Sequence, residues 1–294
     1  MDHRRSIGQL IREGERSISF EFMPPKDEPG VEQLWSAIRD LEPYQPTFVS
    51  VTYGAGGTTR DTTVTITGRI ARETSMRAMG HLTCVGHTRE ELERVLDAYA
   101  EAGVHNVLAL RGDPAEGPRA EWAPTAGGLD YAVELVEMAS ARPEFSVGVA
   151  AFPEGHPSSE SLDRDADVLV AKARAGAQFA VTQMFFRAAD YFALVERVRA
   201  RGVDIAILPG IMPILNLNAI RRQGELIGTE VPAEIIERIS AYDGDPVALR
   251  AEGIAIAAEL CDELLAGGAP GLHFYTLNRS KATREIFAAL NLTV

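Results

Sequence analysis

Residues 78–110 read AMGHLTCVGHTREELERVLDAYAEAGVHNVLAL, and this stretch decides the fold. Ala78–Cys84 and Asn106–Leu110 are short apolar runs typical of buried strands, and Arg89–Ala102 between them repeats its apolar side chains at helical spacing. The Thr88–Glu91 pair has the pattern of a capping box, which favours the beginning of a helix at this point. The stretch is therefore predicted to form one β-α-β unit of a parallel sheet.

The same alternation of short apolar runs and longer helical segments continues through all 294 residues. Eight such units in a chain of this length favour a closed barrel over an open doubly wound sheet, so we predict a single (β/α)8 TIM barrel. No low-complexity linker interrupts the chain, and residues 1–294 are expected to form one catalytic domain. The predicted strands are Ser17–Phe22, Thr47–Tyr53, Ala78–Cys84, Asn106–Leu110, Ser146–Ala151, Phe179–Met184, Ile205–Leu208 and Gly271–Tyr275.

The connection before the last strand is unusually long. Asn216–Gly267 exceeds the length of one ordinary helix, and Pro232 and the pair Asp245-Pro246 divide it into about three. We therefore expect extra helices between the last two strands of the barrel.

Composition limits the partners. The net charge of −13 argues against nucleic acid or an anionic membrane surface, because both are held by positive charge. Met1–Arg16 is charged and lacks the apolar stretch of a secretion signal, so a cytoplasmic location is expected. Cys84 and Cys261 form no CxxC pair, and His81 and His156 lie outside any zinc-ligand spacing, so no metal site is expected.

Polar residues gather where the predicted strands end. In β/α barrels the catalytic groups come from the C-terminal ends of the strands and from the loops that follow them. These positions are therefore the candidates for chemistry. They are Glu21, Thr52, His81, Arg111, Gly112, Asp113, Glu154, His156, Gln183, Asn278 and Arg279.

Glu21 and Asp113 are the strongest catalytic candidates. Glu21 lies between two phenylalanines at the end of a core strand, where burial disfavours a charged carboxylate and so suits a general acid. The alternative is a buried glutamate paired with a structural arginine. Asp113 could simply form a turn with Gly112 and Pro114, but the adjacent Arg111 favours a binding role.

Three other features have structural and functional interpretations. The amide of Gln183 at the end of a buried strand needs hydrogen-bond partners and suits the edge of a heterocycle. Lys172 lies on a predicted helix, where a solvated lysine is the usual interpretation. The run Gly54-Ala55-Gly56-Gly57 matches neither of the established phosphate-binding patterns and is weak evidence for a phosphate site.

At these positions the chain resembles the bacterial methylenetetrahydrofolate reductase family over nearly its whole length. The resemblance consists of short segments that occur in the same order along the predicted barrel. They are Ser19–Lys26, Val49–Ala55, His81–Cys84, Ala109–Asp113, Thr182–Phe186, Leu208–Pro213 and His273–Arg279.

The resemblance implies a flavoprotein oxidoreductase of one-carbon metabolism and methionine biosynthesis. Such an enzyme binds FAD, takes a hydride from NADH or NADPH, and passes it to 5,10-methylenetetrahydrofolate, which becomes 5-methyltetrahydrofolate. The two substrates use one face in turn, which is a ping-pong scheme. By this resemblance Glu21 is the acid that helps to open the folate ring, and Asp113 lies near both flavin and pterin. Members are oligomers, so a homo-oligomer is expected.

The same resemblance implies further contacts. Gln183 and Arg279 would contact folate. Besides Phe152, four positions depart from better-known members. Ala219 and Gln223 replace a glutamine and a phenylalanine near the folate and nicotinamide, and Val168 and Ala171 lack polar groups near the flavin. Residues implied to contact FAD are Thr52, His81, Arg111, Gly112, Asp113, Tyr131, Ala132, Phe152 (often tyrosine in the family), His156, Asp165 and Lys172.

Two other functions are compatible with a barrel. An aldolase or isomerase would need a Schiff-base lysine on a strand or a glycine-rich phosphate loop after the last strands, and neither is evident. A non-catalytic pterin-binding module is the other alternative, although it would have little use for a buried Glu21.

Overall fold

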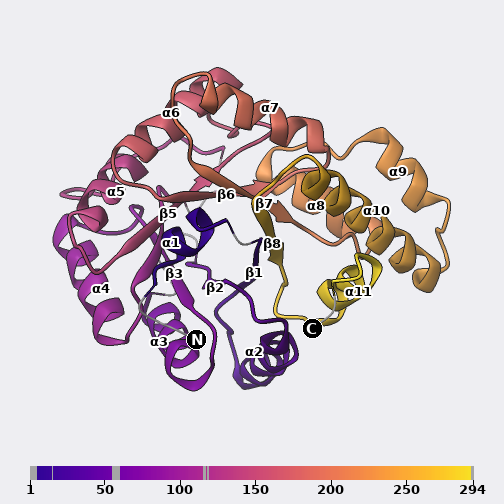
Figure 1. Ribbon diagram of the computed structural model, residues 1–294, viewed down its shortest axis with the longest axis horizontal. Helices are drawn as coiled ribbons and strands as arrows, with labels where there is room; N and C mark the ends of the chain where they lie inside the picture. Colours follow the sequence, from indigo (N-terminus) through magenta and orange to yellow (C-terminus); the bar gives the residue numbers. More distant parts are fainter. Residues whose placement is uncertain (1–4, 15, 55–59, 115–116, 118, 293–294) are drawn as a thin grey trace.

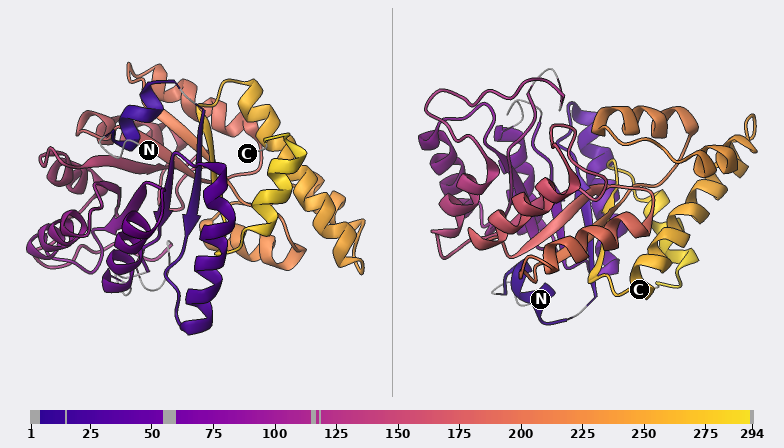
Figure 2. Two further views of the ribbon diagram at one scale, coloured as in Figure 1. Left: turned by 60° about the horizontal axis from the view of Figure 1, so that its bottom comes forward. Right: turned by 90° about the horizontal axis from the view of Figure 1, so that it is seen from above.

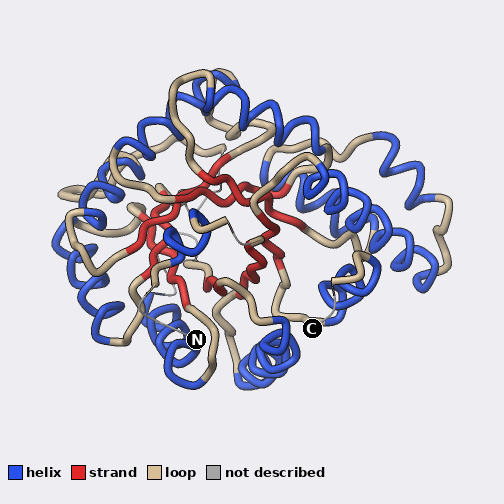
Figure 3. Tube along the Cα trace, viewed as in Figure 1, coloured by secondary structure: helices blue, strands red, loops and turns tan. Residues whose placement is uncertain are grey.

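The computed structural model describes residues 5–14, 16–54, 60–114, 117 and 119–292. Eight parallel strands close into a barrel in chain order, and helices surround the ring of strands (Figures 1 and 3). The predicted TIM barrel is confirmed. The strands are β1 (Ser17–Phe22), β2 (Phe48–Val51), β3 (Ala78–Thr83), β4 (Asn106–Leu110), β5 (Ser146–Ala151), β6 (Phe179–Met184), β7 (Ala206–Ile211) and β8 (Gly271–Tyr275).

The helices follow the strands around the outside of the barrel. The Thr88–Glu91 capping box is present, and Gly103 after that helix has a φ of +80°. The helices are α1 (Ile7–Arg12), α2 (Glu28–Leu41), α3 (Arg60–Glu73), α4 (Arg89–Glu101), α5 (Ala132–Ser140), α6 (Leu162–Arg174), α7 (Ala188–Arg199), α8 (Leu217–Ile227), α9 (Ala233–Ser240), α10 (Pro246–Ala266) and α11 (Lys281–Ala289), with a 3-10 turn η1 (Glu42–Tyr44).

The short helix α1 closes the N-terminal end of the barrel, which the sequence did not predict. Its backbone donates from Ile7 to the Asn106 side chain (3.2 Å) and from Gly8 to the Ser146 hydroxyl (3.2 Å). Ile7 and Ile11 join an apolar layer inside the barrel that includes Phe48, Met79, Leu108, Phe179 and Leu208. This layer leaves the C-terminal end as the open end of the barrel interior.

The strand β7 is longer and later than the predicted Ile205–Leu208. Pro209 lacks a donor and Gly210 disfavours strands, so both residues indicated an end. In the structure a register shift lies opposite them on β6, and the Gly210 N–H donates to the Thr182 hydroxyl at 2.8 Å. That side-chain acceptor replaces the regular ladder bond, so the strand continues to Ile211.

The predicted extra helices before the last strand are α8, α9 and α10. Side chains of Asn216 and Asp245 accept hydrogen bonds at the beginnings of α8 and α10. Figures 1 and 2 show α9 and α10 projecting beyond the ring formed by the other helices. Their residues Ile235, Ile239 and Ile256 pack in a small apolar cluster together with Met184 of β6 and Ile220 of α8. None of the described helices is long and apolar enough to cross a membrane.

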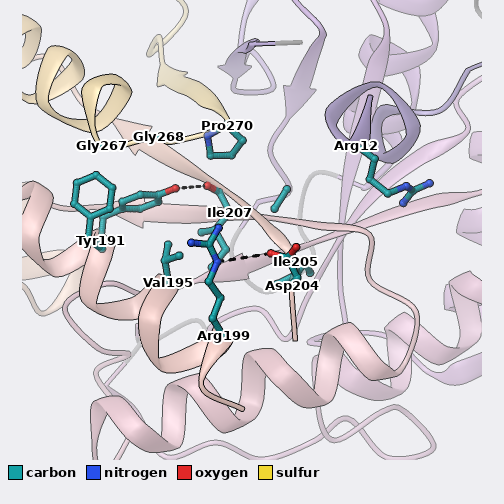
Figure 4. A pocket seen from close by; sticks show the side chains of 12 residues that line it. Arg12, Tyr191, Val195, Arg199, Asp204, Ile205, Ile207, Gly267, Gly268 and Pro270 are labelled. Carbon is teal, nitrogen blue, oxygen red and sulfur yellow. Dashed lines mark hydrogen bonds and ion pairs between the residues drawn. The ribbon is translucent and has the colours of Figure 1, made fainter. Parts of the chain in front are cut away.

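A shallow pocket of about 270 Å³ lies at the N-terminal ends of β7 and β8 (Figure 4). Arg12, Tyr191 and Pro270 line it, and Arg199 is 3.7 Å from Asp204 within it. Tyr191 is committed to the fold, because its hydroxyl donates to the Ile207 carbonyl. In this fold the N-terminal face contributes mainly stability, and the catalytic groups lie at the opposite, C-terminal face.

Candidate active site

The carboxylate of Glu21 is the centre of a polar cluster near the C-terminal end of the barrel interior. Its Oε2 atom lies 3.4 Å from His81 Nε2 and 3.5 Å from His273 Nε2. Both imidazoles are buried, whereas the Glu21 side chain is 14% exposed. A carboxyl group that is held by buried rings on one side and reaches solvent on the other can exchange a proton with a ligand.

The two histidines differ in their surroundings. Burial lowers the pKa of His81, which favours the neutral ring, although the Glu21 carboxylate opposes this effect. The His273 Nδ1 atom lies 2.8 Å from the Ser19 hydroxyl, and its ring stacks on Phe48. Sequence reasoning had listed His81 but had missed His273 and Ser19.

The backbone around Glu21 is fixed by the segment after β8. The Thr276 hydroxyl donates to the Glu21 carbonyl at 2.6 Å. The Asn278 side chain accepts from the Met23 N–H (2.8 Å) and donates to the Met23 carbonyl (2.9 Å). Leu277 and Asn278 both have positive φ values, +50° and +57°, which are uncommon for residues other than glycine. This turn therefore fixes the position of Glu21 from outside its own strand.

A second cluster surrounds Arg111 after β4. Its guanidinium lies over the Trp122 ring at 4.8 Å, with Nη2 3.7 Å from the Asp113 carboxylate and 3.5 Å from His156 Nε2. Gly112 has a φ of +79°, and a Cβ added there would lie 2.4 Å from the Val85 side chain. Only glycine fits this turn without displacement of its neighbours.

The loop after β5 joins this second cluster. The Ser158 N–H donates to His156 Nδ1, so a neutral His156 carries its proton on Nε2, facing Arg111. Two donors that face each other at 3.5 Å cannot bond each other, but both can donate to an acceptor atom of a ligand. Burial and then Arg111 lower the pKa of His156. Asp165 accepts from the His156 N–H at 3.0 Å, which holds the loop against α6.

Lys172 on α6 is buried rather than solvated, so the usual interpretation of a lysine on a helix was wrong here. Only 8% of the residue is exposed, and Nζ donates to the Ala150 carbonyl at 3.1 Å. Burial lowers its pKa from 10.5 to about 8, while Asp165 acts in the opposite direction. A buried lysine of this kind can supply positive charge to an anionic ligand at neutral pH.

The remaining predicted contacts are distributed around the same end of the barrel. Phe152 packs edge-on against His156 at 4.8 Å, and Gln183 Oε1 accepts from the Met184 N–H at 2.8 Å. Tyr131 is exposed and Ala132 is buried at the beginning of α5. Arg279 and Ala219 are exposed, while Thr52 and Gln223 are partly buried, and residues 55–57 of the glycine run lie outside the described residues.

Two further residues stand out: Trp122, which the sequence had not indicated, and Glu154, which it placed at a strand end without a role. The buried Trp122 Nε1 atom has no hydrogen-bond partner among the described residues. Glu154 has a pKa raised to about 7 by burial and then by Asp190. Within the described residues no group of three or more His, Cys, Asp or Glu side chains could hold a metal ion.

The fold and these clusters define a barrel enzyme with a candidate site at the C-terminal strand ends. Comparison with known proteins is more specific, because the model of the family described as "Methylenetetrahydrofolate reductase" matches residues 6–291. The chain therefore belongs to the methylenetetrahydrofolate reductase family. This assignment disfavours the aldolase, isomerase and pterin-module alternatives.

Individual relatives agree with this assignment. The chain is 35% identical to 5,10-methylenetetrahydrofolate reductase of Pectobacterium carotovorum subsp. carotovorum, covering 99% of this chain and 96% of that protein. It is 34% identical to the Escherichia coli K12 enzyme, with 98% and 96% covered. A solved structure of a Clostridium thermocellum protein, described as binding two copies of 5-methyl-5,6,7,8-tetrahydrofolic acid, has a TM-score of 0.63 at 12% identity. It covers 97% of this chain and 98% of that chain, and at this identity it supports the fold alone.

Proposed function

We propose that this protein reduces 5,10-methylenetetrahydrofolate to 5-methyltetrahydrofolate, with FAD as cofactor and NADH or NADPH as hydride donor. The observation that carries the proposal is the Glu21 carboxyl group at the inner end of the barrel mouth, 3.4 and 3.5 Å from two buried imidazoles. Membership of the family supports this reaction, and Glu21 would supply the acid that the reaction needs.

The second cluster fits the anionic part of FAD. Arg111 Nη2 and His156 Nε2 face each other as donors, and the buried Trp122 Nε1 has no acceptor in the part of the chain that the structure describes. Lys172 adds a buried ammonium group nearby, whose pKa responds to Arg111. Arg111, His156 and Lys172 would hold the diphosphate, Asp165 and Phe152 would line the same wall, and Gly112 would let the backbone approach. When bound, FAD carries the hydride between the two substrates.

Glu21 would act on the folate. Its proton passes from Oε2 to the nitrogen of the five-membered ring, and the adjacent carbon–nitrogen bond then breaks. This leaves the electrophilic carbon that accepts the hydride. The clusters of Glu21 and Asp113 both lie at the C-terminal strand ends, and the Asp113 side chain is 47% exposed there, which suits contact with the pterin edge. Gln183 and Arg279 would bind the rest of the folate from β6 and from the turn after β8.

The test separates the two half-reactions by stopped-flow absorbance. Glu21→Gln should keep bound FAD and its reduction by NAD(P)H, and should slow folate reduction by about 10²–10⁴-fold, the usual contribution of a general acid. Glu252→Gln is the control, because the Glu252 side chain is also largely buried, at 19% exposed, but pairs with Arg238 on α9 away from the barrel mouth. It should leave both half-reactions intact. Equal losses in both half-reactions for Glu21→Gln would reassign Glu21 to structure or nucleotide binding.

A further inference from the structure

His273 is a buried titratable residue that the proposed reaction leaves without a role. It lies on β8, in register with Ser19 on β1, and only 1% of the residue is exposed. Phe48 stacks on the ring at 5.7 Å and Tyr275 packs edge-on at 5.5 Å. These neighbours hold the imidazole in one orientation, with Nδ1 toward Ser19 and Nε2 toward Glu21.

The hydrogen bonds of Ser19 determine which nitrogen of His273 carries the proton. The Ser19 hydroxyl donates to the Leu272 carbonyl at 3.3 Å, and a carbonyl can only accept. A hydroxyl has one hydrogen, so while that hydrogen is donated to Leu272 the 2.8 Å contact with His273 is donated by the Nδ1–H group. A neutral His273 therefore presents the lone pair of Nε2 to Glu21 Oε2, 3.5 Å away.

That lone pair favours a proton on the carboxyl group. A lone pair facing a carboxylate is repulsive, whereas a lone pair facing a carboxylic acid accepts a hydrogen bond.

The other titratable groups that face Glu21 cannot take over this function. His81 approaches from β3, but burial lowers its pKa and keeps it neutral. Tyr275 lies on β8, and burial raises its pKa well above 10, so it also stays neutral. On the other side, β2 places the non-titrating Ser50 in register with Glu21. His273 is thus the group in this cluster that is suited to share a proton with Glu21.

We infer that His273, fixed by Ser19, is a positioning residue that keeps Glu21 protonated before each folate reduction. The inference rests on the proposed role of Glu21 as the acid. In each turnover the proton leaves Glu21 for the folate ring nitrogen and the ring carbon–nitrogen bond breaks. The resulting carboxylate takes one proton from water after the product leaves, so His273 changes neither the proton nor the electron balance.

Two variants with matched amide groups test the inference. The amide of His273→Asn occupies the place of Nδ1 and can reach Ser19 but not Glu21, whereas that of His273→Gln occupies the place of Nε2. Infrared spectroscopy of the purified proteins follows the carboxylic acid band of Glu21, identified by its absence in Glu21→Gln. In His273→Asn the band should disappear about one pH unit lower than in the wild type, the effect of one lost hydrogen bond to an ionisable group. His273→Gln should give a smaller displacement.

The rates provide a second readout. In His273→Asn the pH at which folate reduction falls on the alkaline side should move with the infrared band, while flavin reduction by NAD(P)H keeps its wild-type profile. An even loss of rate at every pH, with the band unmoved, would overturn the inference and leave His273 as a packing residue. If His273→Asn does not fold, Ser19→Ala replaces it, because this variant keeps the imidazole ring but removes the acceptor of its Nδ1–H group. The carboxylic acid band of Glu21 should then move in the same direction, and an unmoved band overturns the inference.

The infrared titration does not depend on activity. If the wild-type protein fails to reduce methylenetetrahydrofolate, the proposed function is wrong, yet the band still reports whether His273 controls the proton on Glu21. If the wild type is active and the band does not respond to either substitution, only the inference about His273 is wrong.

Discussion

Lys172→Met should stabilise the flavin-free protein at neutral pH while weakening its hold on flavin. Burial lowers the pKa of Lys172 from 10.5 to about 8, so the folded state binds this proton less tightly than the unfolded state. At 1.36 kcal/mol per pH unit, the lowering corresponds to about 3 kcal/mol of lost stability below pH 8. The substitution also removes the hydrogen bond to the Ala150 carbonyl, which lowers stability by about 1 kcal/mol. The free energy of unfolding of Lys172→Met should therefore exceed that of the wild type by about 2 kcal/mol.

The sign of the pH dependence is specific. Below pH 8 both states of the wild type carry the proton, and the full cost of burying the charge is present. Between pH 8 and 10.5 the folded state has lost the proton and the unfolded state has not, so wild-type stability rises with pH. The advantage of Lys172→Met should therefore be constant up to about pH 8 and should disappear before pH 10.5, because the loss of about 1 kcal/mol from the Ala150 bond remains when the cost of burying the charge is gone.

Urea unfolding of the flavin-free protein at several pH values measures the difference in stability between Lys172→Met and the wild type, and titration with flavin measures the affinity of each. Loss of a charge-assisted bond should weaken flavin binding by roughly ten- to a hundredfold. Lys281→Met is the control, because the Lys281 side chain is 77% exposed and its removal should leave the pH dependence unchanged. The reasoning is refuted if Lys172→Met destabilises the protein at pH 7, or if its gain persists undiminished at pH 10.5.

Three further substitutions address the rest of the site. Asp113→Asn should keep the fold and raise the flavin midpoint potential, since a negative charge near the ring is removed; potentiometry that gives an unchanged or lower value contradicts this placement. Gln183→Ala should raise the KM for methylenetetrahydrofolate by roughly tenfold to over a hundredfold with unchanged FAD content, and loss of flavin with an unchanged KM would move Gln183 to the cofactor site. Gly112→Ala should lower the free energy of unfolding by about 1–2 kcal/mol, because its backbone is left-handed. It should also lower the flavin content, because the new Cβ would meet the Val85 side chain and displace the turn. Gly103→Ala has the same backbone strain in open space, so it should lower stability in urea unfolding without loss of flavin.

Much of this fold could be predicted because its signals are local. The capping box at Thr88–Glu91, the prolines within Asn216–Gly267 and the alternating apolar runs each depend on a few adjacent residues. The boundary of β7 was predicted wrongly because its continuation past Pro209 depends on Thr182, which lies on another strand. Helix α1 was missed for the same reason, since its contacts are with Asn106 and Ser146, far along the chain.

The candidate site was predicted less completely than the fold. Strand-end positions such as Glu21, His81 and Asp113 follow from chain order alone, and the structure brings Glu21 and His81 together. His273 could have been found from its two-residue spacing to Tyr275, which puts both on one face of the strand. The stacking of Arg111 on Trp122 could not have been predicted from the sequence, because it depends on the path of a long loop between β4 and α5.

Strand register explains why an apolar barrel presents this polar cluster. Residues two apart on a strand point to the same face, so each inward-facing position is followed by another nearer the mouth. On β3 the apolar Met79 is followed by His81, and on β1 the Ser19 that holds His273 is followed by Glu21. A slip of one residue in any strand would turn these groups toward the helices. The packing of α1 and the apolar layer at the closed end therefore supports the chemistry directly, because it maintains the register on which the contact between Glu21 and the two imidazoles depends.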